Sequence, residues 1–193
     1  KSKYPFKQSI TNNQKPTTNN QSTFFPRCDF YFLQKFPMTA TLTQSKAMTI
    51  AIADDHKIFR DGIKMALSGK TNLKMLWEAE DGKDMMHKIA IKKPEVLLMD
   101  IRMPEIDGIN GIQLIRKEYE DIKIIVLTMY DDQQMISKMM EMGANAYLTK
   151  TTDPEEIYEA ILTCMNDDFY FNELVNKAVM GKLMQKKNVR QHY

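Results

Sequence analysis

The polar residues best suited to chemistry follow short apolar runs, at points where buried strands would end. They are Asp54 and Asp55 after residues 49–53, Asp100 after 96–99, Thr128 after 124–127 and Lys150 after 146–149. The carboxyl ends of parallel strands share one edge of a sheet, and ligands bind at that edge. A lone aspartate at a strand end is often only a turn residue. As a set, however, these residues predict that carboxylates, a hydroxyl and an ammonium group converge on one site.

Three carboxylates in one place favour a bound cation. Like charges that are packed together repel and resist ionisation, and a cation offsets that repulsion. Mg²⁺ suits such a site because it prefers oxygen ligands in an octahedron, keeps several waters and bridges carboxylates to phosphate. The sequence therefore indicates a magnesium site.

Strand-like and helix-like patterns alternate from Met48 onward. A further strand is expected at 73–79, and helices are expected near 58–67, 85–91, 110–119, 133–142 and from 154. Gly143 fits a left-handed helix end, and Asp153 fits an N-cap before a proline in the first turn. The pattern predicts an α/β fold with a parallel sheet covered by helices on both faces. We expect the flavodoxin-like (βα)5 doubly wound sheet with strand order 2-1-3-4-5, which places the ends of strands 1 and 3 side by side.

Composition and charge exclude several classes of protein. No apolar run approaches the roughly 18 residues that cross a bilayer, so no membrane association is expected. Cys28 and Cys164 have no CxxC motif or nearby histidine, so both are expected to be plain thiols in the cytoplasm. Residues 1–47 carry a net charge of +6 and the remainder −4, which does not describe one continuous nucleic-acid surface.

The first 47 residues differ from the rest of the chain. Residues 11–23 are polar and lack periodicity, so they cannot bury enough apolar surface to offset chain entropy. An aromatic cluster at 24–36 is compatible with a docking peptide or a degenerate targeting segment, but a secretory signal fits poorly. We expect 1–47 to be a disordered or non-native extension before a domain at 48–166.

The motifs at the strand ends resemble those of a known family. They are Ala53-Asp54-Asp55-His56, Asp100-Ile101-Arg102-Met103-Pro104 with Asp107-Gly108 behind it, Thr128, and the segment from Gly143 to Lys150. In this order, they resemble the receiver domain of two-component response regulators. Asp168 to Asn172 and the run from Lys177 to Lys187 resemble the linker of the NarL/FixJ (LuxR-type) subfamily. We therefore expect 167–193 to be a linker or helix that would lead to a helix-turn-helix output domain absent from this chain.

The resemblance implies a role for each matching residue. Asp100 would be phosphorylated by a sensor histidine kinase, and the protein would catalyse this transfer and its own dephosphorylation without being a classical enzyme. Asp55 and Asp100 would bind Mg²⁺ directly, Asp54 through water, and Arg102 through its backbone carbonyl. Lys150 and Thr128 would contact the phosphoryl group, and Thr128 and Tyr147 would form the switch pair. The resemblance further implies a transcriptional role, a homodimer on phosphorylation, and DNA binding only through the absent output domain.

Other functions were weighed against this interpretation. A flavodoxin-like binding module would need a phosphate loop where Asp54-Asp55-His56 stands, and an aspartyl phosphatase would want a DxD pair there. A stand-alone receiver that acts through protein contacts is the alternative to a receiver cut from a transcription factor. His56 is better explained by a helix N-terminal position than by a role as general base.

Two departures from the usual receiver pattern concern the surroundings of the site. Asn110-Gly111-Ile112 looks like a small insertion that lengthens either a loop or the first turn of the third helix. Met129 is bulkier than the small residue often found after the threonine, and we expect it to crowd the phosphoryl pocket or slow water entry.

Overall fold

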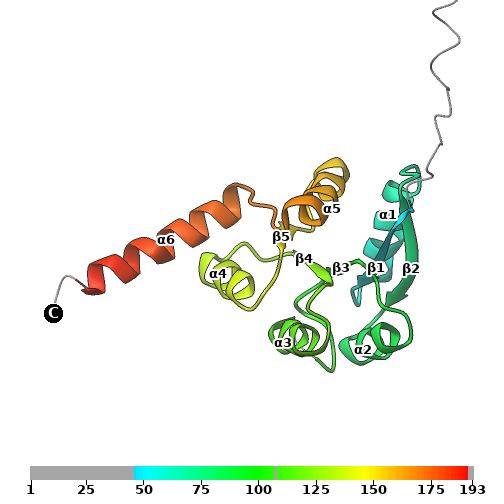
Figure 1. The fold of residues 1–193 in the computed structure, drawn as a ribbon, viewed down its shortest axis with the longest axis horizontal. Coiled ribbons are helices and arrows are strands. Elements are labelled where there is room, and N and C mark those ends of the chain that lie inside the picture. Colours follow the sequence, from blue (N-terminus) through cyan, green and yellow to red (C-terminus); the bar gives the residue numbers. More distant parts are fainter. Residues whose placement is uncertain (1–45, 107, 191–193) are drawn as a thin grey trace, which may run out of the picture. The chain divides into compact units, whose positions relative to one another are not determined.

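The computed structural model describes residues 46–106 and 108–190, with the backbone alone for 185–190. In this part of the chain, strands and helices alternate and a last helix follows (Figure 1). Their bounds are β1 Met48–Ala53, α1 Lys57–Leu67, β2 Leu73–Ala79, α2 Gly82–Ile91, β3 Val96–Met99, α3 Gly108–Glu118, β4 Lys123–Thr128, α4 Gln133–Glu141, β5 Ala146–Thr149, α5 Pro154–Asp167 and α6 Glu173–Arg190. The expectations for residues 1–45 and for Asp107 lie outside the described residues.

The strands form a parallel sheet in the order β2-β1-β3-β4-β5, which confirms the predicted flavodoxin-like arrangement. Ala53 pairs with Met99 at the ends of β1 and β3. Thr128 pairs with Thr149 at the ends of β4 and β5. The residues that follow these pairs therefore lie along one edge of the sheet.

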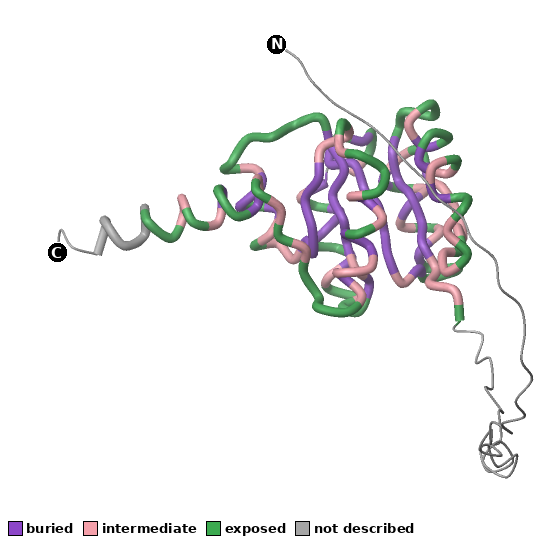
Figure 2. Tube along the Cα trace, turned by 90° about the horizontal axis from the view of Figure 1, so that it is seen from above, coloured by how far each residue is buried: buried purple, intermediate pink, exposed green. Residues whose placement is uncertain are grey.

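Most residues of β1, β3, β4 and β5 are buried, whereas the edge strand β2 is largely half-buried (Figure 2). Because strand side chains alternate between faces, Ala51 and Ala53 join one hydrophobic cluster and Ile50 and Ile52 join the other. The first cluster includes side chains of α2, α3, α4 and α6, and the second includes side chains of α1 and α5. Cys164 lies in the second cluster as a free thiol, and burial raises its pKa to about 12.

Most helix ends lie where the sequence predicts them. The side chain of Asp153 accepts a hydrogen bond from the backbone N–H of Glu155, which confirms the predicted N-cap of α5. Gly143 has φ +106°, which confirms the left-handed residue after α4. The third helix begins earlier than predicted, at Gly108, because the β3–α3 loop closes directly onto it. Residues 110–112 are therefore helical rather than part of a longer loop.

Two apolar residues of α1 do not face the core. Ile58 is 89% exposed and Met65 is 76% exposed. The buried face of α1 is instead formed by Arg60, Ile63 and Leu67. A charged residue thus takes the place in the buried stripe that an apolar side chain would normally fill.

The last helix, α6, packs against α4. Val175 and Ala178 of α6 are buried, and Ser137 of α4 donates a hydrogen bond to the carbonyl of Ala178 at 3.0 Å. Asn172 accepts from the N–H of Val175 and donates to the carbonyl of Tyr147 on β5 at 3.1 Å. The segment expected to be a linker therefore contributes to the core. Among the residues described, none of the helices combines the length and apolar character that crossing a membrane requires.

Gly108 allows α3 to start directly against the end of β3. Its N–H donates to the carbonyl of Ile101 at 2.8 Å, and a Cβ at Gly108 would lie 2.5 Å from the Cα of Ile101. We expect Gly108→Ala to lower the free energy of unfolding by about 2 kcal/mol, because a clash with backbone requires the loop to move. Gly62→Ala in α1 is the control, since a Cβ there meets nothing within 4 Å and alanine favours a helix. Urea unfolding followed by circular dichroism measures both, and an unchanged stability for Gly108→Ala would contradict this prediction.

Candidate functional site

Carboxylates gather at the edge of the sheet where β1 and β3 end. Asp54 is 1% exposed and Asp100 is 4% exposed, while Asp55 reaches solvent. The backbone N–H of Asp100 donates to the carbonyl of Ala53 at 2.9 Å, which holds the two strand ends together. Potential ligand atoms of Asp54, Asp55, His56 and Asp100 all lie within 4.8 Å of one another. The predicted convergence of the three carboxylates is therefore present in the fold.

Lys150 reaches this cluster from the end of β5. Its Nζ lies 2.6 Å from Oδ2 of Asp54 and 2.6 Å from Oδ2 of Asp100, and its side chain is 7% exposed. Burial alone disfavours the charged ammonium, but hydrogen bonds to Asp100 and Asp54 outweigh it, so the pKa of Lys150 is raised. The ammonium group is thus a fixed positive charge between two buried carboxylates.

His56 occupies the open side of the cluster. It is the N-cap residue of α1, as the sequence interpretation expected, but its side chain makes no capping hydrogen bond. Its Nδ1 lies 2.7 Å from Oδ1 of Asp55 and 3.3 Å from Oδ1 of Asp54, and its backbone N–H donates to Asp54 at 2.8 Å. The sequence did not predict that His56 contacts both members of the acidic pair.

The residues present are compatible with Mg²⁺, since oxygen atoms from three carboxylates face one small volume. Beside them lies a hollow of about 570 Å³, lined in part by Asp55, Arg102 and Pro104. The backbone N–H of Arg102 donates to Oδ1 of Asp100 at 3.2 Å. The hollow borders the carboxylate of Asp55 at the exposed side of the cluster.

Thr128 ends β4 with its side chain fully buried. Its hydroxyl has no hydrogen-bond partner among the residues described. A buried hydroxyl without a partner costs free energy, so this group is well placed to donate to an incoming acceptor oxygen.

Tyr147 lies on β5, next to β4, and is also fully buried. Its hydroxyl donates to the carbonyl of Tyr130 at 2.9 Å. Burial raises the pKa of the Tyr147 hydroxyl, and the nearby charges of Asp100, Asp131 and Asp132 raise it further. The ring of Tyr147 is therefore inward and neutral in this structure.

Two side-chain contacts around the site were not predicted from the sequence. The guanidinium of Arg102 stacks on the ring of Tyr130 at 4.1 Å from its centroid. The side chain of Arg60 donates to the carbonyl of Asp54 at 2.6 Å. A charged residue in the buried stripe of α1, three and seven residues before Ile63 and Leu67, is the sequence signal that would have singled out Arg60.

Met129 is 65% exposed and lines a second hollow of about 730 Å³ with His56, Phe59 and Lys150. Nothing in the structure tests the expected effect of Met129 on the phosphoryl pocket or on water entry, so it stays a prediction.

Comparison with protein families identifies the class. The model of the response regulator receiver domain matches residues 50–162, which is more than half of the chain. The chain belongs to the response regulator receiver domain family.

Individual relatives narrow this class. The chain is 31% identical to the transcriptional regulatory protein DegU of Brevibacillus brevis over 126 residues, which cover 65% of this chain and 53% of the relative. It is 39% identical to the uncharacterized transcriptional regulatory protein YhcZ of Bacillus subtilis (strain 168) over 110 residues, which cover 57% of this chain and 51% of the relative. The chain thus spans about half the length of both curated relatives.

Solved structures of receiver domains are similar in fold to this chain. The isolated receiver domain of RcsB from Salmonella enterica serovar Typhimurium, solved with the phosphomimetic BeF3⁻, has a TM-score of 0.64 and 26% identity, covering 69% of this chain and 99% of that domain. The receiver domain of the putative regulator NarL from Mycobacterium tuberculosis has a TM-score of 0.60 and 29% identity, covering 63% of this chain and 98% of that domain. Within the family, the chain carries a receiver domain of the NarL/LuxR kind.

Proposed function

We propose that this chain receives a phosphoryl group on Asp100 from a sensor histidine kinase in a two-component system. The observation that carries the proposal is the pairing of buried Asp100 with Lys150 at an edge that also holds Asp54 and Asp55. Incubation with acetyl phosphate and Mg²⁺ tests it, with intact-mass measurement expected to detect one added phosphoryl group.

In the proposed reaction, a carboxylate oxygen of Asp100 attacks the phosphorus of a phosphohistidine or of a small acyl phosphate. A new P–O bond forms, the P–N or P–O bond to the donor breaks, and the imidazole or carboxylate leaves with the bonding electron pair. Lys150, which pairs with Asp100, would neutralise charge on the transferring group, and the unpaired hydroxyl of Thr128 would donate to one of its oxygens.

Asp55 and Asp100 would hold Mg²⁺ directly, Asp54 through water, and the backbone carbonyl of Arg102 would supply a further oxygen. When bound, Mg²⁺ supplies positive charge to the phosphoryl oxygens and offsets the repulsion among the carboxylates. Asp54 accepts a hydrogen bond at Oδ1 from the N–H of His56, while its Oδ2 lies 2.6 Å from Nζ of Lys150.

The proposed biological role is control of transcription. Solved structures of RcsB include a complex with DNA and two dimers bound to two parallel DNAs. By analogy, 48–166 would act as the receiver, and 167–193 would connect it to a DNA-binding output domain outside this chain, with dimer formation on phosphorylation. A stand-alone receiver acting through protein contacts is the second candidate.

Thr128→Val tests the proposed switch. Valine keeps the shape of the side chain but removes the unpaired hydroxyl, so we expect the free energy of unfolding of the unphosphorylated protein to rise by about 1 kcal/mol. We also expect phosphorylation of Asp100 to persist, while the response of Tyr147 to beryllofluoride in NMR spectra becomes weaker. Thr71→Val, at an exposed turn, is the control. If Tyr147 responds equally in the wild type and in Thr128→Val, the coupling between the two residues is wrong.

A further inference from the structure

Arg60 is a buried cation next to the acidic cluster of Asp54, Asp55 and Asp100. It belongs to α1, is 7% exposed, and lies on the face of the helix that packs against the sheet. Burying a guanidinium is costly unless it is paired and hydrogen-bonded. Its partners therefore indicate what its position achieves.

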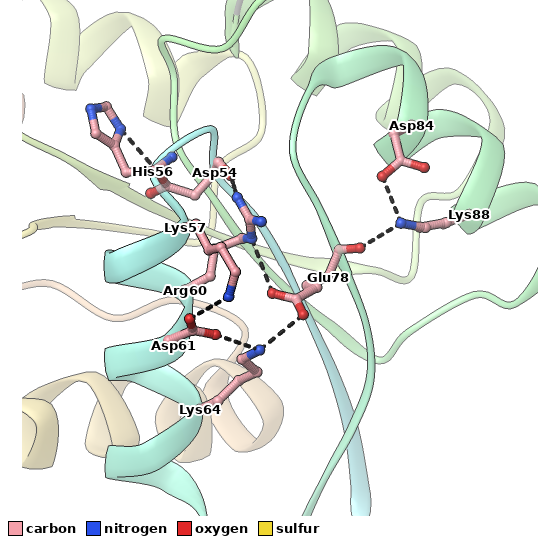
Figure 3. A network of polar contacts seen from close by, with 9 residues as sticks. All are labelled: Asp54, His56, Lys57, Arg60, Asp61, Lys64, Glu78, Asp84 and Lys88. Atoms are coloured by element: carbon pink, nitrogen blue, oxygen red, sulfur yellow. Dashed lines mark hydrogen bonds and ion pairs between the residues drawn. The ribbon is translucent and has the colours of Figure 1, made fainter.

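One partner of Arg60 belongs to the site itself. Nη1 of Arg60 donates to the backbone carbonyl of Asp54 at 2.6 Å (Figure 3). The backbone N–H of Asp54 donates to the carbonyl of Ala79 on β2 at 3.0 Å. Both backbone polar groups of Asp54 are thus fixed by neighbours outside the loop that carries Asp54 and Asp55.

The other partner is an anchor on β2. Nε of Arg60 donates to Oε2 of Glu78 at 3.0 Å, while Lys64 contacts Oε1 of Glu78 at 2.9 Å (Figure 3). The hydrogen bond from Lys64, opposed by partial burial and aided by that from Arg60, lowers the pKa of Glu78. Lys88 of α2 donates to the backbone carbonyl of Glu78 at 2.7 Å. Glu78 is therefore ionised, and its backbone is fixed by Lys88. Its carboxylate orients the guanidinium of Arg60.

The guanidinium consequently connects the edge strand β2 to the first acidic residue of the site. Its planar fork suits this task because two nitrogens donate in fixed directions at the same time. Without it, the buried carbonyl of Asp54 would lack this charged donor, and the loop that carries Asp54 and Asp55 would lose its link to Glu78.

We infer that Arg60 is a positioning residue, which holds Asp54 and Asp55 in the arrangement that binds a divalent cation together with Asp100. The inference rests on the proposed function, because the cation serves the proposed phosphoryl transfer. Arg60 contacts neither the cation nor the phosphoryl group and acts through the main chain of Asp54.

The test compares Arg60→Met with Lys64→Met. Both variants replace a cation of α1 by methionine and remove one partner of Glu78, but only Arg60 contacts Asp54. Titration of the unphosphorylated full chain with MgCl2, followed by the amide resonances of 54–56 and 100, measures the affinity for Mg²⁺. We expect Arg60→Met to weaken Mg²⁺ binding about tenfold, as loss of an outer support of a metal site does. Lys64→Met should bind Mg²⁺ as the wild type does.

A kinetic measurement adds a second readout. In Arg60→Met, the Mg²⁺ concentration for half-maximal phosphorylation by acetyl phosphate should rise, whereas the rate at saturating Mg²⁺ should be retained. Equal affinities in Arg60→Met and the wild type, or equal losses in Arg60→Met and Lys64→Met, would overturn the inference. If Asp100→Asn blocks phosphorylation in the same experiments, the proposed function survives that result. If Asp100→Asn is still phosphorylated, the proposed function fails whatever the affinities are.

Arg60→Lys covers the case in which Arg60→Met does not fold. Lysine keeps the buried charge but cannot donate to Asp54 and Glu78 with the geometry of the guanidinium fork. We expect a folded protein that binds Mg²⁺ more weakly than the wild type. Wild-type affinity in Arg60→Lys would assign Arg60 to folding alone and would overturn the inference.

Discussion

Asp100→Asn is expected to gain no phosphoryl group from acetyl phosphate and Mg²⁺, under conditions in which the wild type gains one. The amide is not a nucleophile, and the substitution also removes the charge that pairs with Lys150. Intact-mass spectrometry measures the added group directly, so the expected difference is complete loss.

Asp167→Asn is the matched control for this experiment. It makes the same chemical change at an exposed residue at the end of α5, and it should be phosphorylated as the wild type is. Labelling of Asp100→Asn at the wild-type level would remove Asp100 from its proposed role. Loss of labelling in both variants would point to a general effect of the substitution.

The second large expected effect is a loss of stability in Lys150→Met. Without the ammonium group, Asp54 and Asp100 are left as buried carboxylates without their shared cation. Breaking such a buried pair by removing one partner costs about 3 kcal/mol or more. We therefore expect the free energy of unfolding in Mg²⁺-free buffer to fall by about 3 kcal/mol, and added Mg²⁺ to restore part of it.

The pKa of Lys150 decides the pH at which to measure this. It is raised in the folded protein above its ordinary value of 10.5. Its contribution to stability is therefore fully present below that value and is lost only as the pH rises through the folded-state pKa. Urea unfolding at neutral pH thus reports the whole contribution of the ion pairs.

Lys70→Met is the control for Lys150→Met. Lys70 contacts Glu155 at 2.6 Å, but Glu155 is 72% exposed, and exposed pairs contribute about 1 kcal/mol or less. A loss in Lys150→Met no larger than that in Lys70→Met, or one that Mg²⁺ does not reduce, would contradict the assignment of Lys150 as the shared cation of the site.

The strand ends explain why so much of the site could be predicted from the sequence. Asp54, Asp100 and Lys150 each follow an apolar run, and in a parallel sheet this local pattern already sets the edge on which a residue lies. Strand order then makes neighbours of residues that are distant in sequence. Local turn chemistry likewise predicted Gly143 and Asp153 correctly.

The support around the site could not be predicted in the same way. The burial of Arg60 on α1 depends on Glu78, which lies 18 residues away on strand β2. The stacking of Arg102 on Tyr130 depends on how two loops meet. The packing of α6 on α4 depends on a tertiary contact of Ser137 with Ala178, for which neither local sequence gives a signal. Long-range partners, rather than local propensity, decide these features.

Asn172 connects the start of α6 to strand β5. The side chain of Asn172 donates to the backbone carbonyl of Tyr147 and accepts from the N–H of Val175. The start of α6 is therefore bonded to β5, the strand that carries the proposed switch residue Tyr147. At 1.5 Å per residue, the 18 residues of α6 extend about 27 Å from that point. By that geometry, a tilt of about 10° at the capped end displaces the far end by about 5 Å. Because Val175 and Ala178 also pack α6 against α4, such a tilt requires α4 to move with α6.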